Sequence, residues 1–110
     1  MAACVVLTAV ADRKTADRLA RGLVKAKFAA CVTVVPGVVS HYRWQRRGGS
    51  REAPTKSREV LLLIKTARKS WARLSRYVRK HHPYELPELV AWPIAFGEKG
   101  YLAWLKDSLK

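Results

Sequence analysis

Two side chains in the sequence carry the donor atoms that transition metals prefer, the thiol of Cys31 and the imidazole of His82. A thiolate is a soft ligand that suits copper, and imidazole binds copper, zinc and other divalent ions. Each residue also has an ordinary structural interpretation. A lone cysteine in a strand packs as a small hydrophobe, and a histidine at a helix end caps carbonyl groups. Both interpretations stay open, and Cys31 can be a ligand only if a second soft or imidazole group reaches it.

A second group of polar side chains indicates a lined pocket. Tyr84 and Glu88 lie on an extended stretch that Pro83 and Pro87 stiffen, so both can face one cleft. Trp44 is expected to be a core or interface aromatic, with a ligand platform as the alternative. The other histidines, at positions 41 and 81, are expected on the surface.

Lys65 is conspicuous because it lies inside an otherwise apolar strand. A charge at such a position must be paired or directed at an opening, and Glu59 or Glu88 can supply the partner. Two interpretations remain: Lys65 lines the pocket of Tyr84 and Glu88, or it forms a structural ion pair between subunits.

Catalytic motifs are missing from the sequence. There is no GxSxG, HExxH, Walker loop or GxGxxG, and no spaced carboxylate pair. Without a nucleophile and base, or a phosphate cradle, the expected function is that of a non-catalytic protein. No resident cofactor is required, although copper or another divalent metal is a possible ligand. An RNP1-like string, which RNA-binding sheets of the RRM type need, is also absent.

The elements that position these residues follow from the hydrophobic periodicity. Apolar, β-branched runs predict strands, and apolar residues at spacings of three and four predict helices. The expected strands cover residues 3–10, 31–35 continuing as 38–44 after a bulge at Pro36-Gly37, 58–66 and 89–95. The expected helices run from an N-cap at Asp12 to about Lys27, from 68 to 82, and from 99 to 109. Residues 45–57 are expected to form a flexible hairpin tip.

This order predicts one domain over residues 1–110 of the α+β class. It is a ferredoxin-like βαββαβ arrangement with a four-stranded antiparallel sheet, two helices on one face, and an additional C-terminal helix. The other sheet face would then be bare and apolar, and the hairpin would overhang the sheet. Because large exposed apolar patches and unpaired ribbons usually mark interfaces, we expect subunit contacts there.

Charge is the most unusual bulk property: 22 Lys and Arg against 8 Asp and Glu give a formal net charge of +14. Such a surface attracts anions, so non-specific binding of polyanions such as RNA, heparin or polyphosphate is an alternative to a purely solvating role. No apolar run is long enough to cross a membrane, and we expect no signal peptide before the first strand. Two cysteines without CxxC spacing are expected to stay reduced in the cytoplasm.

Six blocks of the sequence resemble the CutA family, the divalent-cation-tolerance proteins, in order and in spacing. They are residues 23–32, 36–37, 40–44, 59–66, 82–88 (HPYELPE) and 101–105. The resemblance implies a ferredoxin-like subunit that assembles into a tight homotrimer similar in outline to PII signalling proteins. It also implies a role in tolerance to copper and other divalent ions. The family cysteine matches Cys31, and the pocket of Trp44, Lys65, Tyr84 and Glu88 would lie between subunits. A PII-like signalling or scaffold trimer is the alternative function.

The chain departs from the family at the hairpin. The segment between Trp44 and Glu59 is longer, and it is basic where relatives tend to be acidic; its cations are Arg46, Arg47, Arg51, Lys56 and Arg58. Cation capture by oxygen ligands needs carboxylates, so a metal site at this tip is disfavoured.

Overall fold

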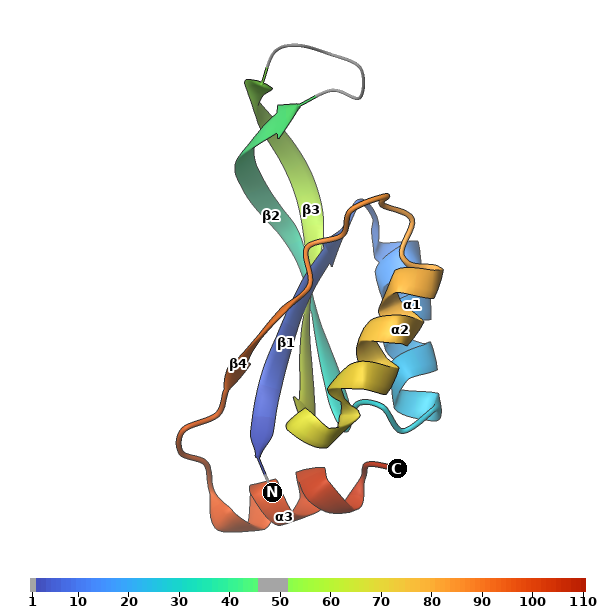
Figure 1. Cartoon of the computed structure of the whole chain (residues 1–110), viewed down its shortest axis with the longest axis vertical. Helices are drawn as coiled ribbons and strands as arrows, with labels where there is room; N and C mark the ends of the chain where they lie inside the picture. Colours follow the sequence, from blue (N-terminus) through green and yellow to red (C-terminus); the bar gives the residue numbers. More distant parts are fainter. Residues whose placement is uncertain (1, 46–51) are drawn as a thin grey trace.

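Strands and helices follow the predicted order in the computed structural model, which describes residues 2–45 and 52–110 (Figure 1). The elements are β1 (Ala3–Val10), α1 (Arg13–Lys25), β2 (Cys31–Gln45), β3 (Glu52–Ala67), a 3₁₀ turn (Arg68–Ser70), α2 (Trp71–His81), β4 (Val90–Pro93) and α3 (Lys99–Asp107). Asp12 is the N-cap of α1, as expected, and its carboxylate accepts from the amide of Thr15 at 2.8 Å. The α+β fold class is confirmed.

One antiparallel sheet has the strand order β2-β3-β1-β4. β4 is an edge strand, which suits its Pro93, because proline has no backbone N–H to donate to a neighbouring strand. β2 is bulged between Val35 and Val38, where Gly37 has φ of +75°, so the bulge expected at Pro36-Gly37 is confirmed. No helix in the described residues is long and apolar enough to span a membrane.

The core lies between the sheet and the two main helices, which cover the same face (Figure 1). Alternate residues of β1 and β3 point into it, and the apolar stripes of α1 and α2 close it. Its fully buried side chains include Val6, Val10, Leu23, Leu62, Ile64, Leu74 and Val78. Val24, one position round the helix from the buried Leu23, is 44% exposed and lies outside the buried stripe of α1.

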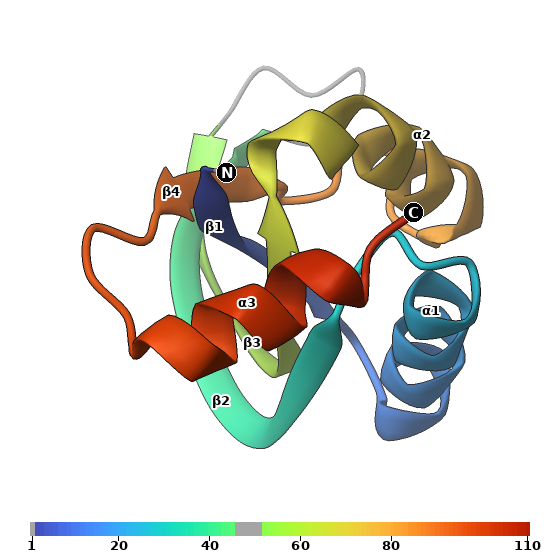
Figure 2. The same cartoon turned by 90° about the horizontal axis from the view of Figure 1, so that it is seen from below.

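The opposite face of the sheet is covered by no helix among the described residues. Val5 and Leu7 of β1 are half-buried there, and their partners on β4, Trp92 and Val90, are 45% and 48% exposed. Helix α3 crosses the end of the sheet instead of this face (Figure 2). Its Leu105 is fully buried. Tyr101 of α3 is 42% exposed and lies outside the buried part of this helix.

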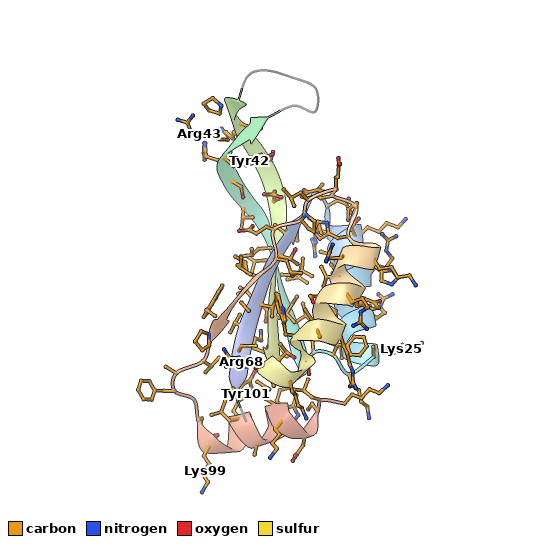
Figure 3. The ribbon with its side chains drawn as sticks, in the orientation of Figure 1. Lys25, Tyr42, Arg43, Arg68, Lys99 and Tyr101 are labelled. Atoms are coloured by element: carbon orange, nitrogen blue, oxygen red, sulfur yellow. The ribbon has the colours of Figure 1, made fainter. Side chains whose placement is uncertain are left out.

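The hairpin is more regular than expected. Ladder pairing continues to Gln45 opposite Glu52, so the loop predicted over residues 45–57 is wrong for Gln45 and for 52–57; the tip itself, 46–51, lies outside the described residues. The hydroxyls of Tyr42 and Ser57 are 2.7 Å apart across the ribbon. On β3, β1 pairs only with Val60 to Ala67, so among the described residues the part of β3 before Val60 pairs with β2 alone. Figure 3 shows Tyr42 and Arg43 on this ribbon, beyond the helices.

Candidate functional site

An open cleft of about 820 Å³ lies where the chain leaves α2, crosses the end of β1 and turns back towards β4. One wall comes from the crossing segment, the other from the ribbon of β2 and β3. The lining residues with polar groups that can meet a ligand are Ser40, His41, Tyr42, Glu59, Tyr84, Glu85 and Glu88. The structure therefore brings Tyr84 and Glu88 to one cleft.

His82 anchors the start of the crossing segment. Its Nε2 donates to the carbonyl oxygen of Ala9 at 2.8 Å, and its Nδ1 accepts from the amide of Tyr84 at 3.1 Å. A carbonyl can only accept and an amide N–H can only donate, so the ring is the neutral Nε2–H tautomer. Burial lowers the pKa of His82, which outweighs the opposing effects of the Ala9 hydrogen bond and the Glu59 charge. Both nitrogens are engaged inside the chain.

Tyr84 connects this segment to the ribbon. Its hydroxyl donates to Oε2 of Glu59 at 3.0 Å, and its ring packs edge-on against His82 with centroids 4.7 Å apart. Burial, followed by the hydrogen bond and the charge of Glu59, raises the pKa of Tyr84 to about 12. Glu59 is only 9% exposed, so this hydroxyl is a specific partner for a buried carboxylate.

The cleft is acidic although the chain is strongly basic. Three of its 8 carboxylates, those of Glu59, Glu85 and Glu88, line this one site. Asp12 adds to the negative field, because its charge also raises the pKa of Tyr84. Carboxylates together with the imidazole of His41 are ligands for divalent cations.

Lys65 lies elsewhere, and neither expected carboxylate is its partner. Its Nζ donates to the hydroxyl of Thr33 and to the carbonyl oxygen of Leu63 at 3.4 Å, and it does not reach Glu59 or Glu88. Within the chain Lys65 pairs with neither carboxylate, because the ladder places it several residues along β3 from Glu59, beside β2; an ion pair between subunits stays a prediction. A hydroxyl and a carbonyl satisfy the ammonium there.

Cys31 lies opposite Lys65 in the ladder and is half-buried on the bare sheet face. His82 is at the other end of β1, bonded to Ala9, whose partner on β3 is Leu61. The structure therefore does not bring Cys31 and His82 together within one chain. Among residues 2–45 and 52–110 no group of three His, Cys, Asp or Glu side chains is close enough to hold a metal ion.

Trp44 lies in β2 opposite Ala53, and its side chain is outside the described residues. Sequence reasoning missed the role of Glu59, which it treated only as a partner for Lys65. The available signal was a single carboxylate beside an apolar run of β3, which indicates a buried and partnered acid. His41 was expected on the surface, and it is exposed, yet it lines the cleft.

Comparison with known proteins gives one consistent result. Residues 4–108 match the family described as CutA1 divalent ion tolerance protein. The chain is 41% identical over 104 residues to the divalent-cation tolerance protein CutA of Thermus thermophilus, covering 94% of this chain and 95% of that protein. It is 39% identical to the chloroplastic CutA of Arabidopsis thaliana, covering 96% of this chain and 55% of that protein. The crystal structure of CutA1 from Oryza sativa superposes with a TM-score of 0.91 at 36% identity, covering 100% of this chain and 95% of that one.

Proposed function

Since the chain belongs to the CutA1 divalent ion tolerance family, we propose that it is a non-catalytic cytoplasmic homotrimer that binds copper or another divalent cation in the response to metal ions. The acidic cleft carries this proposal. A chain with net charge +14 repels free divalent cations, so a cation needs a site where the local field is reversed. The cleft of Glu59, Glu85 and Glu88 supplies that field.

The donors of the cleft are more accessible to a cation than the imidazole of His82, because both of its ring nitrogens are already hydrogen-bonded. Binding at His82 would require the ring to release either Ala9 or Tyr84. Glu59 keeps Oε1 for a cation while Oε2 accepts from Tyr84. Since one chain does not gather three ligands among its described residues, we propose that a neighbouring subunit completes the coordination shell. Cys31 would be a separate soft donor on the bare face.

The trimer is supported by the bare sheet face and by the ribbon. Half-buried and exposed apolar side chains of β1, β3 and β4 line a face that needs cover. A two-stranded ribbon is marginally stable alone, so the overhang of β2 and β3 favours pairing with another subunit. Such packing would place the cleft, with Tyr84 and Glu88, near a subunit boundary.

Calorimetry with Cu(II), Cu(I) and Zn(II) tests the function. Glu88→Gln removes one cleft charge, and Asp107→Asn removes one at the end of α3, far from the cleft. We expect Glu88→Gln to weaken Cu(II) binding about tenfold, about the loss of one good ligand contact, with Asp107→Asn unchanged. Equal weakening by both would mean surface adsorption. If only Cys31→Ser lost metal binding, the site would lie on the bare sheet face.

A second candidate is polyanion binding, which the helical surface favours. α1 and α2 present many Lys and Arg residues and a single carboxylate, Asp17. Anisotropy of a labelled oligonucleotide at about 50 mM salt, where phosphate contacts are strong, tests this function, because binding should fall steeply as salt rises.

A further inference from the structure

A second hollow of about 620 Å³ lies beside the cleft, between α2 and residues 84–87, and it has the opposite charge. Arg76, Arg79 and Lys80 line its helix side. Residues three and four apart are neighbours on a helix surface, so these cations point the same way. We refer to this hollow as the α2 groove.

The three cations have no carboxylate partner among the described residues, as no ion pair is formed by any of them there. Like charges at these spacings repel one another, and the one carboxylate that lines the groove with them, Glu85, lies on the side opposite α2. A bound anion would relieve it. Arg76 and Arg79 are three residues apart, and guanidinium groups are well suited to bidentate phosphate contacts. Lys80 adds a compact third charge.

The remaining lining of the α2 groove differs from that of a simple charged surface. The indole of Trp71 lines it together with the small side chains of Ala72 and Ser75, which let a ligand approach the helix closely. The Ser75 hydroxyl already donates to the carbonyl oxygen of Ala72 at 3.2 Å, so the main donors left for a ligand are the three cations. An aromatic side chain beside cations favours a ligand with both a planar ring and a phosphate.

The charge at the far side of the groove limits the length of that ligand. Tyr84, Glu85 and Pro87 line both hollows, so the wall of the α2 groove is also the wall of the acidic cleft. A polyanion leaving the groove on this side would meet Glu59 and Glu88, which repel phosphate. This arrangement favours a short anion over a continuous nucleic-acid backbone.

We propose that the α2 groove is a binding site for a small phosphorylated ligand with a planar ring, of the nucleoside phosphate class. Arg76, Arg79 and Lys80 hold the phosphates, and Trp71 contacts the ring. The site is separate from the proposed cation site and needs no metal, so it can be tested with EDTA present.

The proposal is tested by titrating the intact protein with ADP while recording ¹H–¹⁵N spectra of the tryptophan indoles. The salt concentration is about 100 mM, where charges are screened nearly as under physiological conditions. We expect saturation at one ADP per chain, with the largest shift at the Trp71 indole, which a Trp71→Phe variant assigns. Arg76→Gln and Arg79→Gln should each weaken binding about tenfold, the loss of one charge-assisted contact. Arg73→Gln is the matched control, because it removes the same charge from α2 outside the groove.

Two further probes test whether the ring of ADP contributes to binding and whether a polymer binds more tightly than a small ligand. Pyrophosphate, which has the phosphates of ADP without its ring, should bind several-fold more weakly. An RNA oligomer should not bind more tightly than ADP at the same salt. The proposal is overturned if ADP does not saturate, if Arg73→Gln weakens binding as much as Arg76→Gln, if pyrophosphate matches ADP, or if RNA outcompetes ADP.

Discussion

The hydroxyl of Tyr84 donates a 3.0 Å hydrogen bond to Oε2 of Glu59, and so ties the segment after α2 to the ribbon of β2 and β3. This bond joins residues 25 positions apart and closes one side of the acidic cleft. The Glu59 carboxylate is only 9% exposed and therefore has little access to water, so it needs a hydrogen-bond donor from the protein, which this bond supplies. The shape of the cleft therefore depends on this pair.

Removal of the hydroxyl should be costly. Tyr84→Phe leaves the Glu59 carboxylate buried without this donor, which we expect to lower the free energy of unfolding by about 1–3 kcal/mol. Urea denaturation at fixed protein concentration measures the change. Tyr101→Phe is the control, because Tyr101 lies on α3 and is 42% exposed. Equal losses in the two variants would show that the bond to Glu59 contributes nothing specific.

Stability should fall in mild acid because of His82. Its pKa in the fold lies below the ordinary value of 6.5, so between the two values the unfolded chain binds more protons than the folded one. The contribution of His82 is thus complete above pH 6.5 and is lost as the pH falls towards the folded-state pKa. His82→Gln, whose amide can both donate and accept, should remove this part of the pH dependence, while exposed His81→Gln should keep it. Unfolding measured from pH 5 to 8 would contradict the account if the two variants had the same profile.

Gly22 should be intolerant of a side chain although it lies inside α1. A Cβ at this position would come within 1.8 Å of the Tyr77 hydroxyl, so α1 and α2 would have to move apart or Tyr77 would have to swing away. Alanine normally stabilises a helix by about 1 kcal/mol relative to glycine. We expect Gly22→Ala instead to destabilise by about 1–3 kcal/mol, as overpacking does. Thermal unfolding of Gly22→Ala, Tyr77→Phe and the double variant checks this, because removing the hydroxyl should recover part of the loss.

The bare sheet face should hold the subunits together. Sedimentation equilibrium should give three 12.4-kDa chains, about 37 kDa in total. Val90→Lys places a charge on this face and should dissociate the assembly, while Val24→Lys, at a similarly exposed position on α1, should not. A single-chain mass at micromolar concentration, or equal behaviour of the two variants, would refute the assembly.

Local signals predicted the parts of the fold that local chemistry determines. Asp12 caps α1 because a carboxylate can reach the first free amides, and Pro36-Gly37 bulges β2 because proline cannot donate there. The hairpin length was missed because Gly and Pro near the tip suggest a loop. Cross-strand pairing determines the length of the hairpin instead, and the ladder accommodates Pro54 opposite Arg43.

The site was predicted only in part, because its partners come from distant segments. Proline spacing was enough to place Tyr84 and Glu88 in one cleft. The environment of His82 is determined by Ala9, 73 residues away, which no local pattern reveals. The same is true of Lys65, whose partner Thr33 depends on the register of β2 against β3.

The most direct test of the account is to locate the cation. Crystals of the protein soaked in Cu(II) and measured at the copper absorption edge give an anomalous peak at each bound ion. We predict one peak per chain in the acidic cleft, within coordination distance of a carboxylate oxygen of Glu59, Glu85 or Glu88, with further ligands from a neighbouring subunit. A fully occupied peak at Cys31 or His82, with none in the cleft, would contradict the account.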